Sequence, residues 1–336
     1  MAVPDWPLSF GSVNPEGWWA NFPVRLEHGH RLLALCVGVF VGVLCAGVWS
    51  QMRALWIAVA VSALASSIGG LFAAPPWLRA HLGIWPAAVA FLISLRLLGG
   101  GKSVTGKTER SLAVCSFVLV CIQATLGGLR VTRETAGAVD VAVVLRILHG
   151  CVAQAFLINL VALSVRLSLL SKSGACREWA VPAVNKRWAW LALGAVYGQL
   201  VLGATMRHLG AGLAIPTFPA ANPEGGWLPK VHNLYTDLNF THTRVGALFV
   251  VVLVVVAVWK IWRSAGAHTV IRRGVIVTGC LVVFQASLGV LVVLHQKPKT
   301  LATMHVVLGA GLLASLAALL VHLYDRASLP KAGSSE

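Results

Sequence analysis

The chain has 336 residues, of which 57% are apolar and only 11% are charged. Soluble globular domains carry about 25% charged residues, so this composition excludes a soluble globular domain and indicates a helical membrane protein. The formal charge of +16 does not require nucleic acid as a partner, because basic residues gather in the cytoplasmic loops of membrane proteins and no basic cluster here carries interleaved stacking aromatics. We therefore expect the lipid bilayer, and no nucleic acid, around this chain.

Apolar runs long enough to cross a membrane as helices follow one another along the chain. They lie at about 32–50, 54–73, 82–98, 111–129, 147–165, 188–206, 245–262, 274–294 and 301–321. The pair within 54–98 is the least regular, because Pro75, Pro76 and Pro86 interrupt it. The sequence thus predicts an all-α, polytopic transmembrane helical bundle with these nine spans.

Lysine and arginine are distributed unevenly between alternate connecting segments. If residues 1–31 lie outside, the inner segments hold more basic residues than the longer outer segments. That bias orients membrane proteins with their basic loops in the cytoplasm. We expect a multi-pass protein of the cell inner membrane, with residues 1–31 on the outer, periplasmic side.

The chain contains an internal repeat. Residues 1–7, MAVPDWP, match residues 213–219, LAIPTFP, and the 20 positions from Pro7 to Glu27 equal the 20 from Pro219 to Asn239. Such a pattern indicates two parallel repeats, each with an even number of spans. We expect an N-terminal half at 1–170, with an inserted helix pair at about 54–98, and a C-terminal half at 185–326.

A second pattern, Gln-x3-Gly, also recurs. It comprises Gln123 with Gly127, Gln199 with Gly203, and Gln285 with Gly289. Residues four apart share a helix face, so the glycine permits close approach of a helix or a macrocycle and the glutamine can bond across helices. Simple helix packing is the plainer explanation of both residues.

The repeat also exposes a gap. In the second half, the span with Gln199 and Gly203 precedes the loop at Pro216, whereas no span precedes Met1. The repeat therefore predicts one further helix upstream, a first helix that this sequence lacks.

Four histidines share one position relative to the predicted spans: His30, His149, His242 and His305. Each lies within about five residues of the outer end of a span, so all four are expected at similar depth. Pairs of imidazoles at equal depth on neighbouring helices suit the axial ligation of a haem iron. His28 is about 100° around the helix from Glu27, which shares the face of His30, and we expect it to be solvated.

Glu27 distinguishes the first half from the second. It precedes His30 by three positions, so the two side chains share a helix face, and the equivalent position in the second half is Asn239. A carboxylate beside an imidazole at a membrane boundary is costly and generally marks function. Two similar sites that differ in this way imply chemistry at one and electron transfer at the other.

Arg31 and Arg244 follow their histidines by one and two positions. Guanidinium groups at this depth can pair with haem propionates, which are anionic. They can equally extend to lipid headgroups. The sequence leaves both roles open.

With these motifs the chain resembles the heme A synthase family. The resemblance rests on Glu27-x-x-His30-Arg31, the PDWP loop at 4–7, Gln123 with Gly127 and Gly128, His149-Gly150, His242 and His305. It covers nearly the whole chain apart from about 54–98, and it implies an eight-helix bundle of two four-helix halves. Members of that family oxidise the C8 methyl of heme O to the formyl group of heme A, for cytochrome oxidase assembly.

The resemblance also implies roles for the site residues. His242 and His305 would ligate a heme b that passes electrons, whereas His30 and His149 would hold the substrate heme O, with Glu27 as the catalytic carboxylate. A heme O synthase would deliver the substrate. The identity of the electron donor and the formation of a homo-oligomer stay open.

Two other classes of function compete with this one. A di-haem cytochrome b that moves electrons to or from quinone would share the four histidines but would need no Glu27. A transporter built on parallel repeats would place polar residues in the middle of the membrane. Here they cluster at its outer edge, which disfavours the transporter.

Overall fold

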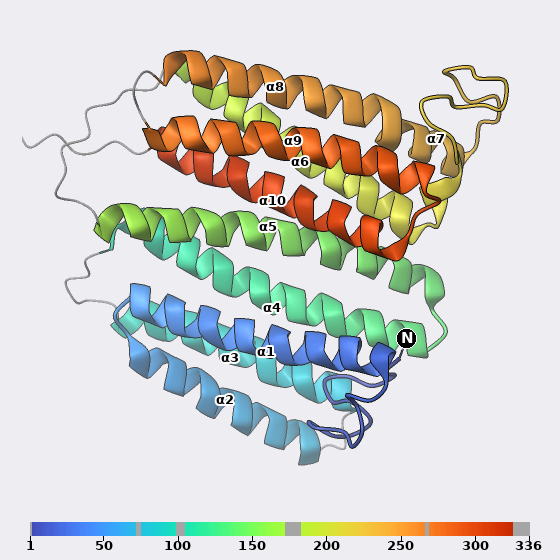
Figure 1. Ribbon diagram of the computed structural model, residues 1–336. Helices are drawn as coiled ribbons and strands as arrows, with labels where there is room; N and C mark the ends of the chain where they lie inside the picture. The colour runs from blue at the N-terminus through green and yellow to red at the C-terminus, as the bar shows by residue number, and fades with distance from the viewer. Residues whose placement is uncertain (1, 72–74, 99–104, 172–182, 266–268, 325–336) are drawn as a thin grey trace, which may run out of the picture. The chain divides into compact units, whose positions relative to one another are not determined.

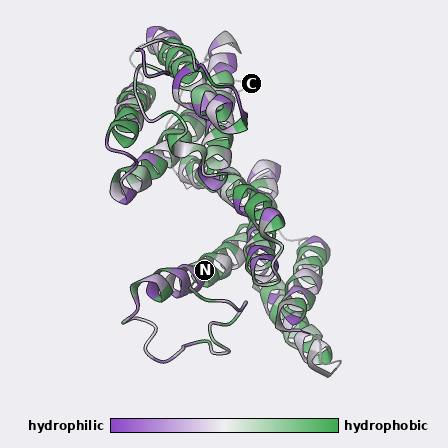
Figure 2. Ribbon diagram, turned by 90° about the vertical axis from the view of Figure 1, so that its right-hand side faces the viewer, coloured by the Kyte–Doolittle hydropathy of each residue, from purple (hydrophilic) through white to green (hydrophobic). Residues whose placement is uncertain are grey.

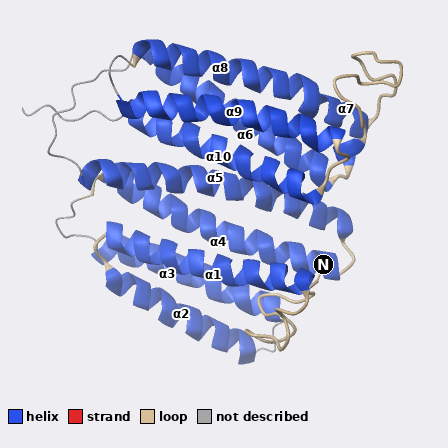
Figure 3. Ribbon diagram, in the orientation of Figure 1, coloured by secondary structure: helices blue, strands red, loops and turns tan. Residues whose placement is uncertain are grey.

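The computed structural model describes residues 2–71, 75–98, 105–171, 183–265 and 269–324 (Figure 1). Within these ranges, nine helices are long and apolar enough to cross a membrane, and Figure 3 shows no strand there. The predicted all-α membrane bundle is confirmed. The helices are α1 (Phe22–Val48), α2 (Met52–Leu71), α3 (Pro76–Leu98), α4 (Lys107–Thr135), α5 (Val139–Ser171), α6 (Ala183–His208), α7 (Leu234–Phe240), the π-helix η2 (Thr241–Gly246), α8 (Ala247–Ser264), α9 (Thr269–Leu294) and α10 (Lys299–Tyr324), with a 3-10 turn η1 (Ala211–Leu213) after α6.

Helix α1 starts well before its apolar run. Asn21 caps it, since the side-chain oxygen accepts from the Val24 N–H at 3.3 Å, and a proline, Pro23, occupies the first turn. The cap extends the helix through Glu27 and Arg31. Helix α7 is capped in the same way by Asn233. Polar residues at the start of each apolar run are therefore held on rigid helix.

The irregular region at 54–98 does form two spans. Helix α3 begins at Pro76, where the missing proline N–H needs no partner, and it continues through Pro86. Helices α2 and α3 pack closely, because a Cβ placed on Gly83 would lie only 2.7 Å from the Ser66 hydroxyl. The prediction of a helix pair here is confirmed, with residues 72–73 outside the described ranges.

The chain divides within α5 into two compact units, Met1–Leu160 and Val161–Glu336. In the first unit, α1 packs against α2 and α4, and α3 packs against the same two helices. Helix α5 is joined to α4 through Asn159, whose amide donates to the Leu112 carbonyl at 2.8 Å and to the Ser116 hydroxyl at 2.7 Å.

In the second unit, α6 and α9 each pack against both α8 and α10, so four helices form a closed ring. Its core is filled by side chains such as Val254, Ile261, Leu313 and Leu316, none of them exposed. Large apolar side chains on the outside of the ring remain exposed, and Figure 2 shows apolar residues along the length of the helices. An apolar exterior of this kind suits a lipid environment.

Candidate functional site

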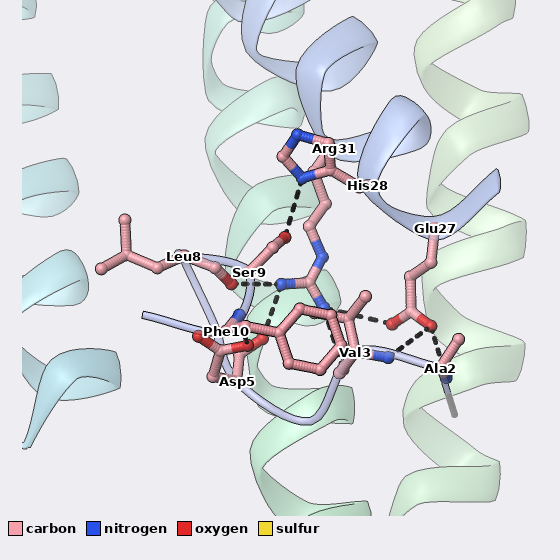
Figure 4. Close-up of polar contacts among 9 residues, drawn as sticks. All are labelled: Ala2, Val3, Asp5, Leu8, Ser9, Phe10, Glu27, His28 and Arg31. Carbon is pink, nitrogen blue, oxygen red and sulfur yellow. Dashed lines mark hydrogen bonds and ion pairs between the residues drawn. The ribbon is translucent and has the colours of Figure 1, made fainter. Parts of the chain in front are cut away.

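A single arginine holds the first loop, residues 2–21, over the start of α1 (Figure 4). The Arg31 Nη1 donates to the Asp5 and Leu8 carbonyls, each at 2.6 Å, and Nη2 donates to the Val3 carbonyl at 3.2 Å. Nη2 also pairs with Glu27 Oε1 at 3.1 Å. The planar guanidinium fork therefore binds three loop carbonyls at once.

Glu27 is bonded to the same loop. Its Oε2 accepts from the Ala2 N–H at 2.9 Å and from the Val3 N–H at 3.3 Å, while Oε1 faces Arg31 (Figure 4). The Glu27 side chain is only 16% exposed. The carboxylate is thus held between the loop and the helix, with each oxygen in a defined position.

His28 does not face solvent as the helix geometry predicted. It is 3% exposed, its Nδ1 lies 2.9 Å from the Ser9 hydroxyl, and its ring contacts that of Trp18 with centroids 4.6 Å apart. The prediction was wrong because the first loop folds back over this face of α1. That contact joins residues far apart in the sequence, so helical spacing alone could not indicate it.

The second loop, residues 209–233, is held in the same way. Arg244 Nη2 donates to the Thr217 carbonyl at 2.6 Å and to the Ala220 carbonyl at 2.8 Å. When Met1 is matched to Leu213, these two carbonyls occupy the positions of Asp5 and Leu8. The internal repeat seen in the sequence thus recurs as a pair of equivalent hydrogen bonds.

A π-helix accounts for the different histidine–arginine spacing in the two halves. A π turn holds one more residue than an α turn, and η2 places such a turn around Thr243. Arg244 can therefore bind its loop from two positions after His242, as Arg31 does from one position after His30. π turns of this kind occur frequently at functional sites.

The residue equivalent to Glu27 has a different environment. Asn239 is completely buried, its amide donates to the Ala211 carbonyl at 2.9 Å, and its oxygen lies 3.4 Å from Arg244 Nη1. The amide both donates and accepts, which a carboxylate cannot do. The two halves therefore share their loop geometry and differ in the charge at this position.

We expect Arg244→Lys to lower the free energy of unfolding by about 2–3 kcal/mol, because hydrogen bonds from a charged group contribute about 1.5–3 kcal/mol and a lysine cannot reproduce the fork. Thermal unfolding in detergent, together with protease cleavage within residues 209–233, measures the effect. Arg207→Lys, at an exposed position of α6, is the matched control. Equal stability of the two variants would show that the arginine contributes nothing to holding the loop.

His30 and His149 face each other in the first unit. Their ring centroids are 6.4 Å apart and their planes are nearly perpendicular, at 82°. His30 comes from the third turn of α1 and His149 from the first half of α5. Among the residues that the structure describes, no three or more His, Cys, Asp or Glu side chains gather into a metal-binding cluster. The imidazoles thus occur in a pair, the number of protein ligands in a six-coordinate haem with two axial side chains.

The three Gln-x3-Gly motifs lie against His149, His242 and His305, one motif against each histidine. The glutamine amide nitrogens reach the His149 carbonyl from Gln123 at 2.9 Å, the His242 carbonyl from Gln199 at 2.6 Å, and the His305 ring nitrogen Nε2 from Gln285 at 3.3 Å. The motif that was attributed to helix packing thus packs specifically on histidines.

The glycines of the same motifs leave room for the imidazole rings. A Cβ would lie 3.2 Å from His149 at Gly127, 2.7 Å from His242 at Gly203 and 3.0 Å from His305 at Gly289, in each case from the ring atom Cε1. Real Cβ atoms essentially never approach within 3.0 Å, and 3.0–3.4 Å is tight. These glycines are therefore required for the positions of the rings.

Helices α3 and α4 support the first loop. The Trp6 ring of that loop covers Gly128 so closely that a Cβ there would lie 2.7 Å from it, and it packs against His81 of α3 with ring centroids 5.2 Å apart. Gly127 and Gly128 thus receive a histidine on one side and a loop tryptophan on the other. No residue pattern in the sequence indicated this contact.

Comparison with known proteins identifies the family. A family model described as "Cytochrome oxidase assembly protein" matches residues 21–317. The chain belongs to this family. The match covers both units and all four candidate histidines, so the resemblance that the motifs indicated is confirmed.

Curated relatives agree with that assignment. The Heme A synthases of Alkalihalophilus pseudofirmus and Halalkalibacterium halodurans are each 22% identical to the chain, over 93% of its length and 83% of theirs. The Heme A synthase of a Bradyrhizobium species is 30% identical over 141 residues. That last match spans only 38% of either protein.

Proposed function

We propose that the protein is a heme A synthase, which oxidises the C8 methyl of heme O to the formyl group of heme A. In this proposal the substrate lies between His30 and His149 of the first half, residues 1–170. The observation that carries it is the facing pair of imidazoles in the half that also holds Glu27. Its membership of the cytochrome oxidase assembly family supports the same activity.

The spacing of the two imidazoles suits a haem iron. Imidazole nitrogens bind divalent metal ions at about 2.0–2.1 Å, so two rings on opposite sides of one iron have their centres about 6 Å apart. The separation of 6.4 Å between His30 and His149 supports this arrangement. Perpendicular ring planes are compatible with it, since each ligand plane turns freely about the line through the iron.

A second haem, heme b, would be held by His242 and His305 in the second half, residues 185–326. Residues 266–268 and 325–326 of that half lie outside the described ranges. The Nδ1 atoms of both histidines are buried without a hydrogen-bond partner, and glycines make room for both rings. These features fit imidazoles that hold a bound group; the His305 ring also contacts the Gln285 amide nitrogen through Nε2, at 3.3 Å.

The difference between Glu27 and Asn239 assigns the chemistry to the first half. Bound haem supplies the oxidation chemistry, while the protein supplies ligation, orientation and proton transfer. The Glu27 carboxylate can take up a proton or stabilise positive charge near the methyl carbon, and the loop N–H groups of Ala2 and Val3 fix its position. The amide of Asn239 can do neither, so the second half is suited to electron transfer.

Arg31 and Arg244 serve these sites through the loops. Each guanidinium binds the carbonyls of its loop, which places the loop over the helix ends that carry the histidines. The basic residues of the opposite loops favour a periplasmic location for these ends in the cell inner membrane. Heme O from a heme O synthase would enter there. Its methyl group would be hydroxylated twice, each time with one dioxygen, two protons and two electrons from a donor protein or quinol, releasing one water. Loss of water from the resulting diol would give the formyl group.

Extraction of haems from cells tests the proposal. The full chain is expressed in cells that make heme O and lack a heme A synthase of their own, and haems are separated by chromatography and identified by mass. We expect hydroxylated and formyl haem that cells with an empty vector do not contain. Unaltered heme O, together with heme b bound to the protein, would instead identify a di-haem cytochrome b.

A further inference from the structure

Three glutamines beside the candidate ligands, Gln123, Gln199 and Gln285, carry buried amide oxygens without a partner. Gln123 and Gln199 each anchor their amide nitrogen on the backbone carbonyl of a histidine, His149 and His242. The Oε1 atoms of both glutamines are buried without a partner, and so are the Nδ1 atoms of both histidines. Leaving a buried polar atom unpaired costs about 1–3 kcal/mol, so four such atoms in two matched pairs require an explanation.

The packing keeps each amide next to its own imidazole. Gly203 accommodates the His242 ring, and Gly246, one helical turn after His242, accommodates the Gln199 amide oxygen in the space that a Cβ would take. At the other site, Gly127 lies against the His149 ring in the same way.

A histidine that binds iron through Nε2 must place its Nδ1–H elsewhere. Ligating histidines almost always donate that N–H to a carboxylate, a carbonyl or a water, which fixes the ring and raises its basicity. No such partner binds His149 or His242 Nδ1 in the described part of the chain. Gln123 and Gln199, whose amide nitrogens are bonded to the backbone carbonyls of these two histidines, each carry an unused acceptor.

We propose that Gln123 and Gln199 are positioning residues whose amide oxygens accept the Nδ1–H of His149 and His242 when these histidines ligate haem. The inference rests on the proposed haem ligation and adds one such residue to each haem site. Gln285, whose amide nitrogen contacts the His305 ring at Nε2, has a different arrangement and serves as an internal contrast.

The second half offers the cleaner test, because heme b stays bound between turnovers. An acceptor at Nδ1–H makes an axial imidazole more electron-donating, which stabilises ferric iron. Gln199→Leu is therefore expected to raise the midpoint potential of heme b, and Gln199→Glu to lower it. The Gln199→Leu shift carries the test, because the negative charge that Gln199→Glu introduces lowers the potential of a nearby haem even without an Nδ1–H contact.

Steric variants provide a second readout. Gly203→Ala is expected to displace the His242 ring, which alters the low-spin electron paramagnetic resonance signal and lowers the haem content of purified protein several-fold. Gly198→Ala, on the same helix with no atom within 4 Å of the added methyl, is expected to match the wild type in both.

The outcomes separate this inference from the proposed function. Haem bound to the wild type, with the same potential in Gln199→Leu as in the wild type, would overturn the positioning role alone. A wild type that retains no haem would overturn both proposals. If Gln199→Glu does not accumulate in membranes, the direction of the shift in Gln199→Leu decides the question, and a lowered potential would overturn the inference.

Discussion

Replacement of Glu27 by glutamine is expected to leave haem binding intact and to reduce the formation of hydroxylated and formyl haem by at least about 100-fold, since a positioned acid or base contributes about 10²–10⁴-fold. Glutamine has nearly the same shape, and its oxygen can still accept from the Ala2 N–H, so the first loop should stay in place. What it loses is the negative charge and the ability to carry a proton. Haem extraction and the optical spectrum of the purified protein measure the two properties separately.

Arg31→Lys is the matched control for Glu27→Gln. It keeps the positive charge beside Glu27 but loses the fork that binds the Asp5 and Leu8 carbonyls, so it tests the loop without changing the carboxylate. We expect reduced stability and partial activity. Normal output of formyl haem from Glu27→Gln would remove the carboxylate from the mechanism, and an equal loss in both variants would make it a loop anchor only.

The variants His149→Ala and His305→Ala are expected to differ in whether they retain the heme b spectrum and in whether they convert heme O. His305→Ala should abolish the low-spin spectrum of heme b, because a six-coordinate iron needs both axial ligands. His149→Ala should keep that spectrum and eliminate conversion of heme O, since it removes a ligand of the substrate only. Optical and electron paramagnetic resonance spectra of purified variants, with haem extraction from the same cells, separate the two effects.

His232→Ala is the control for these variants. His232 lies in the second loop, is exposed and pairs with Asp237 at 2.9 Å, away from every candidate ligand. It should match the wild type in spectrum and product. Loss of heme b in His149→Ala, with retention in His305→Ala, would reverse the proposed assignment of the two halves.

The sequence predicted the membrane-spanning helices. All nine spans form where apolar runs lie. In a bilayer the backbone N–H and C=O groups have no water to bond with, and a helix pairs these groups within its own segment. The starts of the helices were less accurate. Helix α1 begins at Phe22 rather than near Leu32, since a cap at Asn21 and not hydropathy decides that boundary.

The candidate site was predictable in its residue types and not in its contacts. His30 and His149 were expected at similar depth and were paired through the family resemblance, and the structure brings their rings together. The partners of Arg31 were not predicted. Every residue has a backbone carbonyl, so the sequence does not show which carbonyls accept a hydrogen bond. The matching carbonyl positions in the repeat, Asp5 with Thr217 and Leu8 with Ala220, become informative only once the loops are seen folded.

The extra residue in η2 affects how this chain is compared with others. A search pattern that demands adjacent histidine and arginine finds His30-Arg31 and passes over His242-Thr243-Arg244, although both arginines bind corresponding carbonyls. An alignment of the halves therefore needs a one-residue gap within Thr241–Gly246. Without that gap, every position of α8 is matched to the wrong face of α1, and the similarity between the two repeats is underestimated.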